Sequence, residues 1–231
     1  TTAIEHFCSK TNRPMLSFCC AESTELRDLL VRTSFEDGQI KYRLGVLAEA
    51  FKYGYTVLIN EVDLLRPTEL TALNEMVTGK PIIIPETGET IYMNKQFRFV
   101  ATANTNGAGD ESGLYQGTGR LNQAFIDRCR MVELEYLDPS DEFCVIKKSA
   151  PNLPDSICKS MIEIANDIRD QFNPRRVDKD TTDAPKLTCV LSTRSLIRWA
   201  KLTHDFRKMD NGEGIWFAFE QSFLARIKSY E

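Results

Sequence analysis

Hydrophobic and polar positions follow two alternating patterns between Thr1 and Leu137. Short apolar runs, typical of buried β-strands, are separated by stretches in which apolar residues recur every three or four positions, as on one face of a helix. The predicted strands are Met15–Cys20, Tyr55–Ile59, Phe97–Ala103 and Met131–Leu137. The predicted helices are Thr1–Thr11, Glu22–Leu30, Leu44–Lys52, Thr68–Thr78 and Asn122–Cys129. This alternation predicts an α/β domain built on a parallel sheet.

Two further segments carry the pattern of β-hairpins. Asp37-Gly38 is a dipeptide typical of a two-residue turn, and the runs on both sides of it alternate between apolar and polar residues. The turn Pro85-Glu86-Thr87-Gly88 lies between Ile82–Ile84 and Thr90–Tyr92. We therefore expect two hairpins inserted between the helices and strands of the α/β domain.

The alternation of strands and helices stops at Asp138-Pro139. From there to Glu231 the apolar residues have helical spacing, interrupted by a polar loop, Asn173–Lys186. The sequence thus predicts two domains, an α/β core from Thr1 to Leu137 and a helical domain from Asp138 to Glu231.

Composition excludes several classes of protein. The 231 residues include 29 basic and 33 acidic ones, a net charge of −4, which argues against a sequence-independent grip on nucleic acid. Seven cysteines without a CxxC pair, and only two histidines, give no zinc spacing and favour reduced core thiols in the cytoplasm. No apolar run approaches the roughly 18 residues that span a membrane.

Candidate chemistry lies at the ends of two predicted strands. The apolar run Tyr55–Ile59 is followed directly by Asn60 and Glu61, and Phe97–Ala103 is followed by Asn104. Parallel strands bring such residues to one sheet edge, where α/β proteins bind ligands. A core strand with a solvated polar exit, or an Asn that starts a turn, would give the same pattern for each segment taken alone.

Two arginines extend the set of candidates. Arg128 lies near the end of the helix Asn122–Cys129, and Arg194 lies in the first turn of a helix capped by Ser192 or Thr193. Guanidinium groups stay charged and bind phosphate oxygens bidentately. Taken alone, Arg128 fits a surface ion pair with Asp127 or Glu133 equally well, and Arg194 fits a solvated cationic face.

The order of these residues along the chain resembles the AAA+ ATPases, above all the MoxR and cobalt-chelatase ATPase-subunit (CobS-like) group. The most specific part is the run Ala103-Asn104-Thr105-Asn106-Gly107, followed by Gly113-Leu114-Tyr115, Gly117-Thr118 and Asn122-Gln123-Ala124. The resemblance implies a P-loop core of the ASCE type with a C-terminal helical lid. The two hairpins look like the helix-2 and pre-sensor-1 insertions of the MoxR clade.

Roles for individual residues follow from this resemblance. Asn60 and Glu61 occupy the Walker B pair, with Asn60 toward Mg²⁺ and Glu61 positioning the attacking water. Asn104 is similar to the sensor-1 residue and Arg128 to the arginine finger that reaches a neighbouring subunit's nucleotide. Arg194 resembles the sensor-2 arginine, which touches the nucleotide of its own subunit.

The chain departs from the family pattern in two places. Asn60 replaces the usual Asp, which removes one negative charge near the metal while keeping a carbonyl acceptor. The Gly-Lys-Thr/Ser phosphate loop is expected immediately before Thr1-Thr2, so that Thr1 would supply the hydroxyl for Mg²⁺ and both threonines would lie at the nucleotide. We therefore expect a further strand upstream, between the strands that end at Asn104 and Leu137.

The resemblance implies ATP hydrolysis with Mg²⁺ in a homo-oligomeric ring, expected to be a hexamer, that remodels or activates a partner protein. A partner with a von Willebrand A-type domain is expected, and a cobalt chelatase is one candidate client. Two alternatives remain open: a nucleic-acid motor, disfavoured by acidic hairpin tips, and a nucleotide-binding scaffold that turns over weakly because of Asn60.

Overall fold

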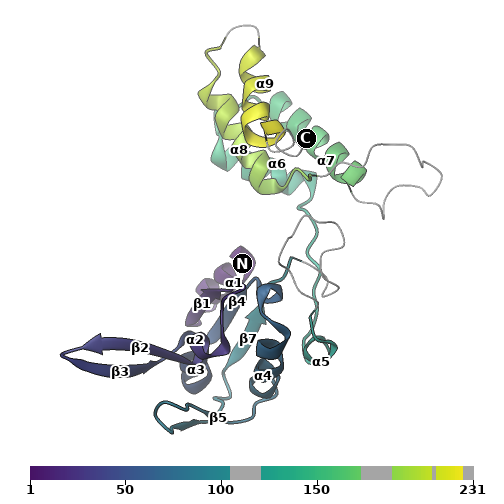
Figure 1. The fold of residues 1–231 in the computed structure, drawn as a ribbon. Helices are drawn as coiled ribbons and strands as arrows, with labels where there is room; N and C mark the ends of the chain where they lie inside the picture. Colours follow the sequence, from purple (N-terminus) through teal and green to yellow (C-terminus); the bar gives the residue numbers. More distant parts are fainter. Residues whose placement is uncertain (105–120, 173–188, 210–211, 226–231) are drawn as a thin grey trace. The chain divides into compact units, whose positions relative to one another are not determined.

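The computed structural model describes residues 1–104, 121–172, 189–209 and 212–225 (Figure 1). The chain divides into two compact units, Thr1–Val132 and Glu133–Glu231. The glycine-rich run from Gly107 to Gly119 and the polar loop Asn173–Lys186 lie outside the described residues.

A three-stranded parallel sheet forms the centre of the first unit. Its strands are β1 (Met15–Cys19), β4 (Thr56–Asn60) and β7 (Arg98–Ala101), in the order β1-β4-β7. Val57, Leu58 and Ile59 in β4 are fully buried, which explains why this strand reads as a continuous apolar run. The predicted α/β class with a parallel sheet is confirmed.

Helices lie between the strands in sequence and pack around them. They are α1 (Thr2–Lys10), α2 (Leu26–Leu30), α3 (Val46–Tyr53), the 3₁₀ turn η1 (Val62–Leu64), α4 (Pro67–Val77) and α5 (Gln123–Ile126). Pro67 is the first residue of α4, a position where a backbone N–H would have no acceptor within the helix. Gly54 ends α3 in the left-handed conformation, with φ 80°. Helix α3 packs on β1 and β4 through fully buried Leu47 and Phe51.

Two hairpins occupy the predicted positions. The first pairs β2 (Val31–Glu36) with β3 (Gln39–Leu44), and the second pairs β5 (Ile82–Ile83) with β6 (Thr90–Ile91). Asp37 and Gly38 both have positive φ, 55° and 77°, as a type I′ turn requires. The β2–β3 hairpin extends away from α2 and α3 (Figure 1).

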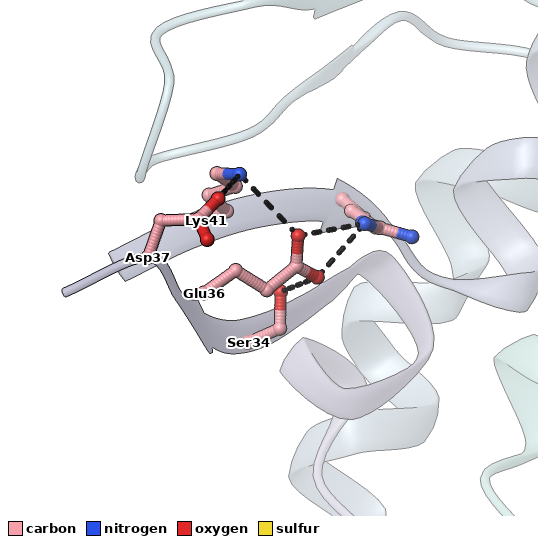
Figure 2. Close-up of polar contacts among 5 residues, drawn as sticks. Ser34, Glu36, Asp37 and Lys41 are labelled. Atoms are coloured by element: carbon pink, nitrogen blue, oxygen red, sulfur yellow. Dashed lines mark hydrogen bonds and ion pairs between the residues drawn. The ribbon is translucent and has the colours of Figure 1, made fainter. Parts of the chain in front are cut away.

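The two faces of the β2–β3 hairpin differ in polarity. Strand pairing places Phe35 opposite Ile40 and Thr33 opposite Tyr42, and Phe35 and Ile40 are 75% and 60% exposed. On the other face, the Glu36 carboxylate accepts hydrogen bonds from Ser34, Lys41 and Arg43, as Figure 2 shows around the labelled carboxylate. The Ser34 hydroxyl, followed by the cations of Arg43 and Lys41, lowers the pKa of Glu36.

The prediction of a strand at Met131–Leu137 is wrong. These residues form no strand, and apolar side chains on both sides of the segment are exposed, with Met131 at 55% and Val132 at 78%. A β-strand needs a neighbouring strand with which its backbone exchanges hydrogen bonds. No described strand pairs with this segment. The apolar pattern alone therefore misidentified it.

The second unit is helical. It contains α6 (Pro139–Ser149), α7 (Asp155–Phe172), α8 (Thr193–Asp205), α9 (Glu213–Phe219) and a π-helical turn, η3 (Glu220–Leu224). Its separate core includes Ile146, Met161, Leu196, Trp199 and Phe223. The contact boundary between Val132 and Glu133 lies a few residues before the boundary expected from the sequence, after Leu137.

Candidate active site

Asn60 is the last residue of β4 and lies at the carboxyl edge of the sheet. Its Oδ1 atom accepts a hydrogen bond of 2.7 Å from the Thr1 hydroxyl and one of 3.2 Å from the Thr102 hydroxyl. Its backbone carbonyl accepts from the N–H of Cys20, which follows β1. The parallel sheet therefore brings the ends of three strands and the start of α1 together at this amide.

Glu61 follows in a left-handed backbone conformation, with φ 56° and ψ 48°. Asn12 and Asp37 are the other non-glycine residues with positive φ in the described parts of the chain, and both belong to the residue types that tolerate this region. Glutamate does not, and a strained backbone at such a position is a marker of functional sites. The turn directs the chain away from β4 as soon as the strand ends.

Asp63, which is not among the candidates predicted from the sequence, connects the segment after β4 to Asn104 after β7. Its side chain is fully buried, and Oδ2 accepts a 3.0 Å hydrogen bond from the backbone N–H of Asn104. This bond fixes the chain at Asn104 directly after β7. The sequence feature that could have identified Asp63 is its position, two residues after Glu61 and just beyond the end of an apolar strand.

Thr102 provides the remaining connection between β4 and β7. Its hydroxyl accepts from the N–H of Glu61 at 3.3 Å and donates to Asn60, while its carbonyl accepts from the N–H of Val62 at 2.9 Å. The backbone N–H of Thr102 donates to the Ile59 carbonyl at 2.9 Å. The turn that carries Glu61 is thus hydrogen-bonded along its length to the end of β7.

The electrostatic environment at this edge is acidic. Burial raises the pKa of the Cys20 thiol to about 12, and the charges of neighbouring Cys19, Asp63 and Glu61 contribute in the same direction. Cys20 is 4% exposed, so its thiol remains neutral at physiological pH. A cation placed near Glu61 and Asp63 would offset part of this negative potential.

Thr1 and Thr2 lie at the start of α1. Thr1 is the N-cap residue, yet its hydroxyl donates to Asn60 rather than capping its own helix. The N-terminal end of a helix carries a partial positive charge and free N–H groups, which favour phosphate. Helix α1 therefore presents an anion-favouring end next to the acidic edge of the sheet.

Arg128 and Arg194 lie in different units of the chain. Arg128 is exposed after α5, and its Nη1 donates to the Ala124 carbonyl of the same helix. Arg194 is an exposed residue in the first turn of α8, in the helical unit. The Ser192 hydroxyl accepts a hydrogen bond from the N–H of Ser195. Of the two residues predicted to cap α8, Ser192 and Thr193, the cap is therefore Ser192.

The oxygen atoms at the sheet edge fit Mg²⁺. The ion takes oxygen ligands in an octahedron at 2.0–2.1 Å, so adjacent ligands lie about 2.9 Å apart, close to the 2.7 Å between Thr1 Oγ1 and Asn60 Oδ1. The described residues contain no cluster of three or more His, Cys, Asp or Glu that could hold a metal.

The sequence pattern of a family described as AAA domain (dynein-related subfamily) matches residues 1–129. This chain belongs to that AAA family. A second pattern, CbbQ/NirQ/NorQ C-terminal, matches residues 142–216 in the helical unit. The resemblance to AAA+ ATPases of the MoxR and CobS-like group is confirmed, and family membership supports an ATPase that uses nucleotide and Mg²⁺.

Individual relatives cover the AAA domain and the helical unit together. Midasin of Dictyostelium discoideum is 31% identical over all of this chain, which corresponds to 4% of that protein. The aerobic cobaltochelatase subunit CobS of a Sinorhizobium species is 28% identical over all of this chain and 68% of its own length. Midasin of Giardia intestinalis is 24% identical over 87% of this chain and 4% of its own length. The chain therefore spans a small fraction of the two midasins.

Proposed function

We propose that this AAA domain hydrolyses ATP at the carboxyl edge of its sheet. The observation that carries the proposal is the hydrogen-bonded group formed by Thr1, Asn60, Thr102 and Glu61, in a chain that belongs to an ATPase family. Glu61 accepts the proton of the attacking water or orients that water. Its strained turn, fixed by Thr102, limits the positions available to the carboxylate.

The other residues hold or orient the substrate. Thr1 and Asn60 supply oxygen atoms for Mg²⁺, which neutralises phosphate charge when bound. Thr2 offers a backbone or hydroxyl donor at the start of α1. Asn104 orients water through its amide, and Asp63 sets the position of the chain at Asn104 through the bond to its N–H.

Arg128 and Arg194 supply positive charge from two directions. We propose that Arg128 reaches the nucleotide of a neighbouring copy, because it is exposed at the end of α5. Arg194 serves the nucleotide of its own chain from the helical unit, which then acts as a lid. Together they stabilise the charge that develops on the transferred phosphoryl group.

The proposal extends to assembly and partners. A finger acting in trans requires a neighbouring copy of the chain, and a homo-hexameric ring in the cytoplasm is our expectation. The relative called a cobaltochelatase subunit makes a chelatase one candidate client, and a partner with a von Willebrand A-type domain fits that role. Within the described residues, no helix has both the length and the apolar character needed to cross a membrane.

The ion pairs of the hairpins argue against a nucleic-acid motor. Lys41 and Arg43 contact Glu36, Arg27 contacts Glu86 at 2.6 Å, and Lys52 contacts Glu89 at 2.7 Å. The side-chain hydrogen bond to Glu89 raises the pKa of Lys52. Cations already paired with carboxylates release fewer counterions when they meet a phosphate backbone.

An ATPase assay on the full-length protein, with and without Mg²⁺, tests the proposal. We expect Mg²⁺-dependent turnover that Glu61→Gln abolishes while nucleotide binding survives. Binding of nucleotide without turnover in the wild type would identify a scaffold. Binding to a labelled oligonucleotide at two salt concentrations, with affinity falling steeply at the higher one, would identify a nucleic-acid motor.

A further inference from the structure

A buried arginine joins three parts of the helical unit. Arg169 of α7 is 5% exposed, and its guanidinium forms a bidentate ion pair with Glu142 of α6, which is fully buried. The two bonds, Nη1 to Oε2 and Nη2 to Oε1, are both 2.9 Å. Nη1 also donates to Asn166 Oδ1 at 3.0 Å. The charges are therefore paired and hydrogen-bonded on several sides.

The same ion pair holds the two residues on either side of the N-cap of α8. Nε of Arg169 donates to the carbonyl of Leu191 at 2.8 Å, and the Thr193 hydroxyl donates to Glu142 Oε1 at 2.6 Å. Between them, Ser192 caps α8 by accepting from the N–H of Ser195. The backbone from Leu191 to Thr193 is thus fixed by side chains of α6 and α7.

Arg194 is the next residue, and it is exposed. Its backbone has little freedom because Thr193 is bonded to Glu142 and Ser195 is bonded to the cap. The long side chain of Arg194 then begins from a defined point on the first turn of α8.

Tyr136 brings the joining segment, the first residues of the helical unit before α6, to this ion pair. The guanidinium carbon of Arg169 lies 4.1 Å from the centre of the Tyr136 ring, a cation–π contact. Tyr136 lies two residues before Asp138, the N-cap of α6, and belongs to the helical unit. One guanidinium therefore contacts the joining segment and, through Glu142 and Leu191, the start of α8.

We infer that the Glu142–Arg169 pair is a positioning device that fixes the first turn of α8 for Arg194 and couples it to the joining segment at Tyr136. The inference rests on the proposed contact between Arg194 and nucleotide. A buried ion pair is often no more stabilising than apolar residues of similar volume, so core stability gives little reason for it. A device that specifies one geometry for a phosphate-binding arginine does give a reason, since misplaced charge loses binding energy.

Thr193 provides the cleanest test, because its hydroxyl can be removed without leaving the ion pair unpartnered. Thr193→Val removes the donor to Glu142, and Thr193→Ser keeps it. Thr203, a buried threonine farther along α8, gives the matched control Thr203→Val. The measurements on full-length protein are the Kd of a fluorescent ATP analogue, kcat and KM for ATP, and amide hydrogen exchange of the first turn of α8.

We expect Thr193→Val to weaken nucleotide affinity by about 10-fold, the lower end of the range for one lost hydrogen bond to a charged group, and to speed amide exchange at residues 194–197. Thr193→Ser and Thr203→Val should keep wild-type affinity and exchange. In an Arg194→Ala background, Thr193→Val should have no further effect on affinity, because the hydroxyl acts through Arg194. An additive loss in the double variant, or wild-type exchange and affinity in Thr193→Val, would overturn the inference.

Tyr136 tests the connection to the joining segment. Tyr136→Phe keeps the ring under the guanidinium and Tyr136→Leu removes it, so exchange of the first turn of α8 should be faster in the Leu variant only. Equal amide exchange of this turn in the two variants would show that Tyr136 does not help to position it.

The proposed role of Arg194 is tested separately. If Arg194→Ala retains wild-type nucleotide affinity, that role fails, whereas amide exchange in Thr193→Val still decides whether the ion pair fixes the turn. The two failures are therefore distinguishable.

Discussion

Two substitutions at Glu61 separate the chemistry of its side chain from the strain of its backbone. Glu61→Gln removes the negative charge but keeps a side chain in the left-handed conformation at φ 56°. Glu61→Gly removes the carboxylate and also the Cβ atom that disfavours this conformation. Both variants should lose turnover, and only the glycine variant should gain stability.

The expected gain follows from the conformation and the half-buried position of Glu61. A left-handed conformation costs an L-residue about 1–2 kcal/mol. The greater freedom of glycine in the unfolded chain offsets about 0.5–1 kcal/mol of this. The bond from the backbone N–H of Glu61 to Thr102 survives either substitution. We expect Glu61→Gly to raise the free energy of unfolding by about 0.5–1 kcal/mol and Glu61→Gln to leave it within about 0.5 kcal/mol of wild type.

Turnover should fall by about 10²–10⁴-fold in both variants if Glu61 activates water. Urea unfolding of nucleotide-free, full-length protein measures stability, and a coupled-enzyme ATPase assay measures turnover. Trp199 and Trp216, the two tryptophans of the chain, belong to the helical unit, so the sheet is better followed by amide exchange of Val57–Ile59 than by tryptophan fluorescence.

Asn12→Gly is the matched control for the backbone effect. Asn12 has φ 52° and is exposed, and asparagine tolerates this conformation, so its replacement should give a smaller gain than Glu61→Gly. A Glu61→Gly variant no more stable than Glu61→Gln would show that the turn stores no strain. Wild-type turnover in Glu61→Gln would refute the catalytic role.

Three further predictions concern Asn60, Arg128 and Cys20. Asn60→Asp restores a negative charge at the oxygen that Thr1 contacts, so half-maximal turnover should need less Mg²⁺; an unchanged Mg²⁺ titration would place Asn60 away from the metal. Arg128→Ala should bind ATP yet lose about 10³–10⁵-fold in turnover, and mixing it with Glu61→Gln subunits should restore activity; mixed rings without recovery would exclude action in trans. Cys20 should resist alkylation at pH 8 while exposed Cys19 reacts, as mass spectrometry can show, and equal labelling of both would contradict the burial of Cys20. Because folding raises the Cys20 pKa from 9.0 to about 12, this thiol's contribution to stability is complete below about pH 9 and is lost as the pH rises toward 12.

The sequence by itself determined the parallel sheet, the first hairpin turn and the two ends of strands where polar residues meet. Buried parallel strands are apolar on both faces, so β4 could be recognised as a continuous apolar run. Asp37-Gly38 satisfies the positive φ values of its turn through its residue types alone. These features depend on neighbours within a few residues, which is why local pattern was sufficient.

The tertiary structure decided what depends on residues distant in sequence. Met131–Leu137 has the apolar pattern of a strand, but strand formation requires a pairing partner, and no described strand supplies one. The hydrogen bonds of Asp63 to Asn104 and of Thr1 to Asn60 cross 41 and 59 positions of the chain. The contact between Glu142 and Thr193 spans 51 positions, and neither residue type signals it, because buried hydrogen bonds are selected by the fold that brings donor and acceptor together.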